Sequence, residues 1–60
     1  MNLTALAEKA TTILMQKNPQ LANNKAVAIT EVALRQYFGE TGINPTFAPD
    51  EFLSYFQTIA

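Results

Sequence analysis

The chain has 60 residues, with no cysteine and no histidine, and four Lys or Arg against five Asp or Glu give a formal net charge of −1. The missing residue types exclude disulfides, thiolate nucleophiles, zinc sites of the usual ligand type and the Ser-His-Asp arrangement. The charge balance does not provide the basic stripe with which nucleic-acid binders neutralise several phosphates.

The first predicted helix covers residues 3–17. Asn2 is a favoured N-cap residue. The helix is predicted to end at Asn18, because the residue before Pro19 is pushed out of the α region. Thr11 lies among the polar residues on the side opposite its apolar stripe. An unbroken i, i+3, i+4, i+7 series forms the apolar side: Leu3, Leu6, Ala7, Ala10, Ile13 and Leu14.

The second predicted helix, residues 24–38, has apolar residues around most of its circumference, which is the most informative feature of the chain. Asn23 or Asn24 is predicted to cap its start, and Gly39 to form a left-handed C-terminal cap. Glu31 and Arg35, four residues apart, are predicted to pair on the solvent side. One broad apolar face is predicted to join the core: Ala26, Val27, Ala33, Leu34, Tyr37 and Phe38.

The stretch 39–48 is predicted to be irregular, with its two apolar residues, Ile43 and Phe47, held in the core. Its Asn-Pro pair repeats the pair at residues 18–19, so the same kind of connection is predicted twice. The third helix, residues 49–59, begins at a proline, and Phe47 is expected to pack on Phe52 as a hydrophobic staple. Its predicted buried face is Phe52, Leu53, Phe56 and Ile59.

These elements predict an all-α fold, a small three-helix bundle that forms one domain over residues 1–60. A domain of this size buries only about 60% of its unfolded surface, and oligomerisation is one way to add stability. Two packings remain open. Helices 1 and 3 can both pack on the broad face of helix 2, or each can pack on a different face.

In the first packing, a second apolar face of helix 2 stays in water. Ala28, Ile29 and Val32 form this face, and they are the candidate protein-interaction residues. Tyr55, at the edge of helix 3, is a fourth candidate; it is either a boundary residue with its hydroxyl in water or an interface anchor. The expected partner is another protein or a second copy of the chain in a homodimer.

The leading functional hypothesis is therefore a non-catalytic protein–protein interaction module of accessory, adaptor or regulatory type. The alternative is a helix-turn-helix regulator, but residues 49–60, where the reading helix would lie, contain no Lys or Arg. We expect no enzymatic activity, no cofactor, no metal and no small-molecule substrate, because acid-base residues are few and the carboxylates do not converge. No membrane-spanning run or signal peptide is visible, and the missing cysteines suggest the cytoplasm.

Overall fold

The computed structural model describes all 60 residues and confirms the all-α prediction. The elements in chain order are α1 (Leu3–Lys17), α2 (Asn23–Thr41), the short 3₁₀ helix η1 (Pro45–Phe47) and α3 (Pro49–Ile59). No strand is present, and none of the helices has the length and apolar character needed to cross a membrane.

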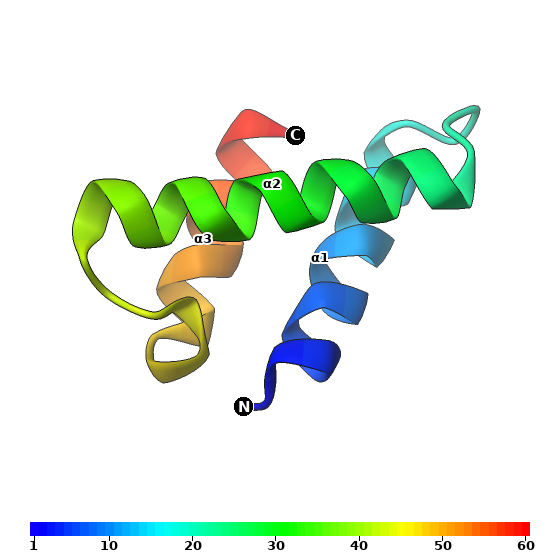
Figure 1. Ribbon diagram of the computed structural model, residues 1–60. Helices are drawn as coiled ribbons and strands as arrows, with labels where there is room; N and C mark the ends of the chain where they lie inside the picture. Colours follow the sequence, from blue (N-terminus) through cyan, green and yellow to red (C-terminus); the bar gives the residue numbers. More distant parts are fainter.

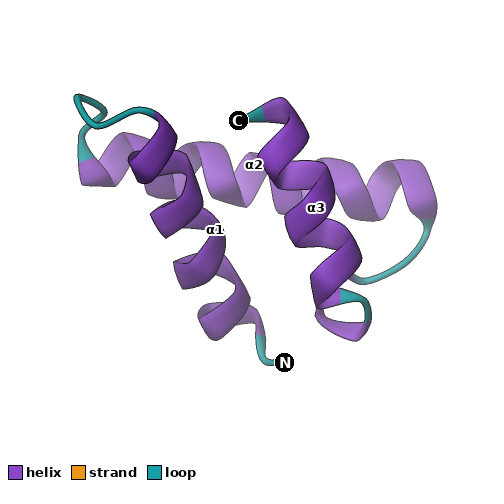
Figure 2. Cartoon of the chain, turned by 180° about the vertical axis from the view of Figure 1, so that it is seen from behind, coloured by secondary structure: helices purple, strands orange, loops and turns teal.

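α1 and α3 lie on the same side of α2. In Figure 1 α2 passes in front of both, and in the reverse view of Figure 2 both lie in front of α2. They run in roughly the same direction and cross α2 steeply, with α2 connecting the end of one to the start of the other. The first of the two packings left open by the sequence is therefore the one observed.

The core lies between the three helices and draws on each of them. Three of its nine residues are alanines, whose small side chains let the helices approach closely where they cross. The aromatic part joins α2 to α3, since the ring centroids of Tyr37 and Phe52 lie 5.4 Å apart in an edge-on arrangement. The core residues are Leu6, Ala10, Leu14, Ala26, Ala33, Leu34, Tyr37, Phe52 and Phe56.

One hydrogen bond between side chains crosses the core. The Thr11 hydroxyl of α1 donates to the Thr30 hydroxyl oxygen of α2 at 3.2 Å, and both residues are buried. The sequence places Thr11 on the side opposite the apolar stripe, but the structure buries it. A buried hydroxyl needs a hydrogen-bond partner, and here each threonine provides one for the other. The pair therefore favours one position of α1 along α2.

The predicted ends of α1 are confirmed. The Asn2 side chain accepts a hydrogen bond from the Ala5 N–H at 2.7 Å, and α1 stops at Lys17. The two Asn-Pro connections also make the same turn: Leu21 N–H donates to Asn18 O, and Phe47 N–H to Asn44 O, at 2.9 Å each.

α2 is longer than predicted at both ends. It begins at Asn23, and Ala22 occupies the N-cap position, so neither Asn23 nor Asn24 caps it. Gly39 lies inside the helix, and the left-handed cap is Gly42, with φ +70°. A glycine inside a helix costs some stability but does not by itself end the helix. The first glycine after the apolar run, Gly39, therefore continues α2, and the helix ends at the second.

The predictions for residues 39–48 are partly wrong. Ile43 is exposed, and Phe47 is 85% exposed, so Phe47 makes no staple on the fully buried Phe52. Pro45 is buried instead. Inside η1 the chain turns so tightly that Pro45 and Phe47 point in different directions, and the proline takes the inward place.

Several outer members of the predicted apolar faces are also exposed: Leu3, Val27, Phe38 and Ile59. The steep crossing of the helices explains this. Only the middle of each apolar stripe reaches a neighbouring helix, whereas the ends and edges of the stripe leave the contact. Periodicity marks the apolar side of a helix but does not give the crossing angle that decides which part is covered.

We expect Leu34→Ala and Phe56→Ala each to lower the free energy of unfolding by about 2–5 kcal/mol, because each empties part of the buried core. Thermal or urea unfolding followed by circular dichroism measures the effect. Phe47→Ala is the control, since its ring is mostly in water already and its loss should change stability little. Unchanged midpoints for both core variants would contradict this core.

The two glycines of the α2 region should respond to alanine in opposite ways. Gly39→Ala should stabilise by about 0.5–1 kcal/mol, because the site is helical and nothing lies within 4 Å of the added Cβ. Gly42→Ala has the same open space but a positive φ, so it should destabilise by about 1 kcal/mol. Thermal midpoints that move in the same direction would show that α2 ends elsewhere.

Candidate functional site

The side of α2 that faces away from α1 and α3 carries three of the four candidate residues. Ala28 is exposed, Ile29 is 46% exposed and Val32 is 48% exposed. At about 100° per residue, Val32 and Ala28 lie opposite the buried Thr30 and Tyr37. We call Ala28, Ile29 and Val32 the outer face of α2. No other element of the chain covers it (Figures 1 and 2).

The outer face continues at one edge toward α3. Ile29 borders a small, mostly apolar pocket of about 300 Å³ at the C-terminal end of α3, together with the exposed Ile59 and the half-buried Leu21. Nearby, the Lys17 ammonium group donates a hydrogen bond to the carbonyl oxygen of Gln57 and so ties the end of α1 to the last turn of α3. The apolar surface therefore extends from α2 onto a fixed neighbouring helix.

Tyr55 does not share this surface. It is half-buried on α3, and its ring centroid lies 5.4 Å from that of Tyr37 and 6.2 Å from that of Phe52. Tyr37 belongs to the inner side of α2, so Tyr55 contacts the core side of the molecule. The structure brings Ala28, Ile29 and Val32 together and places Tyr55 apart from them.

Charged residues flank the outer face on both sides. On one flank the predicted pair is confirmed: Arg35 Nη2 lies 3.7 Å from Glu31 Oε2, with both side chains largely in water. Glu40 lies on the other flank, and Lys25, seven residues before Val32, lies within the face itself; neither makes an ion pair. An exposed pair such as Glu31–Arg35 adds little to stability, so these charges have no large structural role within the monomer.

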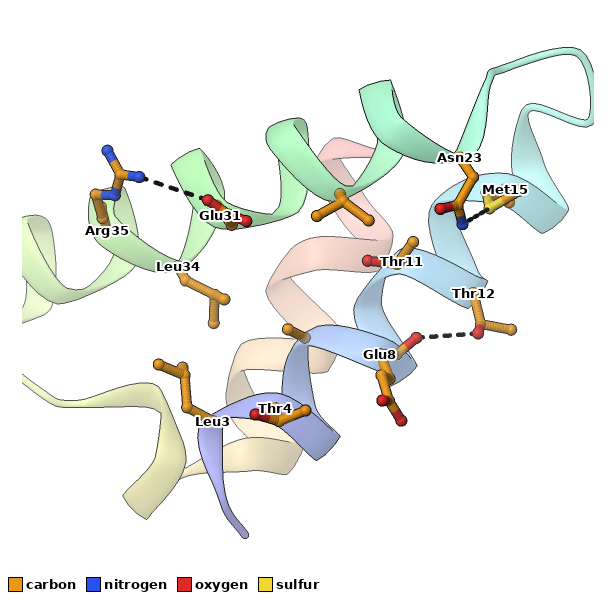
Figure 3. Close-up of a pocket in the computed structure, with 12 residues that line it drawn as sticks. Leu3, Thr4, Glu8, Thr11, Thr12, Met15, Asn23, Glu31, Leu34 and Arg35 are labelled. Carbon is orange, nitrogen blue, oxygen red and sulfur yellow. Dashed lines mark hydrogen bonds and ion pairs between the residues drawn. The ribbon is translucent and has the colours of Figure 1, made fainter.

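A groove between α1 and α2 was not predicted. It encloses about 820 Å³ (Figure 3), and a second groove of about 620 Å³ shares Leu3, Leu34 and Arg35 with it and continues toward η1. Val27 and Phe38, which helical periodicity predicts in the core, line these grooves instead. The sequence does place both residues at one edge of the broad apolar face of α2, which is the part of a face least certain to be covered. Only the angle at which α1 crosses α2 shows that this edge stays open.

The polar groups in the larger groove are mostly engaged locally. Thr12 donates its hydroxyl to the Glu8 carbonyl oxygen at 2.9 Å, and Asn23 Nδ2 approaches the Met15 sulfur at 3.5 Å. Figure 3 shows Glu8 turned away from the Glu31–Arg35 pair on the opposite wall. The walls therefore offer apolar surface and a few hydroxyls rather than a set of converging acids and bases.

Comparisons with family models, with curated proteins and with solved structures found no match to this chain.

Val32→Glu should leave the chain folded, with a change in unfolding free energy of about 1 kcal/mol or less, because the position already faces water. The neighbouring Ala33→Glu is the matched control. Ala33 is 2% exposed, and a carboxylate there would be buried without a partner, so this variant should unfold. Circular dichroism melts of the two variants make the comparison. Loss of structure in Val32→Glu would show that the outer face is part of the core.

Proposed function

We propose that the chain is a small non-catalytic module that binds protein through the outer face of α2. The observation that supports this most directly is the exposure of Ile29 and Val32 beside Ala28, on the one side of α2 that no other helix covers. Apolar side chains grouped on a surface and bordered by charges are typical of protein contact sites.

The shape of the outer face also suits a protein partner better than a small molecule. It is the convex back of a helix, whereas small-molecule sites are concave and bury most of their ligand. A helix or sheet from another chain can lie along such a ridge and cover Ala28, Ile29 and Val32 together.

Nucleic-acid binding gains no support from the fold. The four cations are Lys9 and Lys17 on α1 and Lys25 and Arg35 on α2, and α3 carries none. Lys17 and Arg35 are already engaged, with Gln57 and Glu31 respectively. No observation therefore favours the helix-turn-helix alternative over protein binding.

A photoreactive amino acid tests the proposal in the cells that make the protein. With p-benzoylphenylalanine in place of Val32, we expect irradiation to produce a covalent adduct with a protein chain. The control is the same group in place of Gln16, an exposed polar residue of α1, which should give no adduct.

The absence of an adduct from position 32 would contradict the proposal. The photoreactive group in place of Val27 examines the groove between α1 and α2 in the same way. An adduct from position 27 without one from position 32 would assign protein binding to the groove and not to the outer face.

A further inference from the structure

We draw no further inference here: the strongest candidate, the apolar groove that runs between α1 and α2 toward η1, carries nothing, because nothing in the structure shows what fills it and Arg35, the one Lys or Arg that lines it, is already paired with Glu31.

Discussion

The inner side of α2 is the constraint on which the rest of the structure depends. Ala26, Thr30, Ala33 and Tyr37 are all buried there, and α1 and α3 both pack against that one side. No other helix of the chain lies behind α2 to cover its far side. The exposed outer face is therefore a direct consequence of both neighbours sharing the same side, and so is the groove where α1 diverges from the edge of α2.

Local signals in the sequence predicted most of the fold. The helix ends follow from effects that act within a few residues. The Asn2 side chain caps α1, Pro19 keeps Asn18 out of the α region and ends it, and the fixed φ of Pro49 starts α3. The end of α2 could not be predicted in this way. Gly39 and Gly42 are both reasonable caps, and only the contacts of the following turn decide between them. The predicted burial of Phe47 was wrong for a similar reason. Pro45 occupies the inward position in this loop, so Phe47 is left exposed.

The candidate site was predicted in part. Helical periodicity alone separates Ala28, Ile29 and Val32 from the inner side of α2, so their shared surface follows from sequence once both neighbours pack on that inner side. The grooves and the place of Tyr55 depend on how steeply the helices cross, and hydrophobic spacing carries no information on that angle. Thr11 illustrates the same limit: its hydroxyl is buried only because Thr30 of another helix meets it.

The charges near the two ends of α2 oppose its helix dipole, with Lys25 near the N-terminus and Glu40 near the C-terminus. Each charge at the wrong end of a helix weakens it by about 0.3–1 kcal/mol, and a 60-residue domain has a total stability of only about 3–9 kcal/mol at usual values per residue. Lys25 and Glu40 together therefore remove a noticeable part of the stability of a chain that has no disulfide to compensate. Their placement has no favourable electrostatic role within the monomer, since neither residue makes an ion pair.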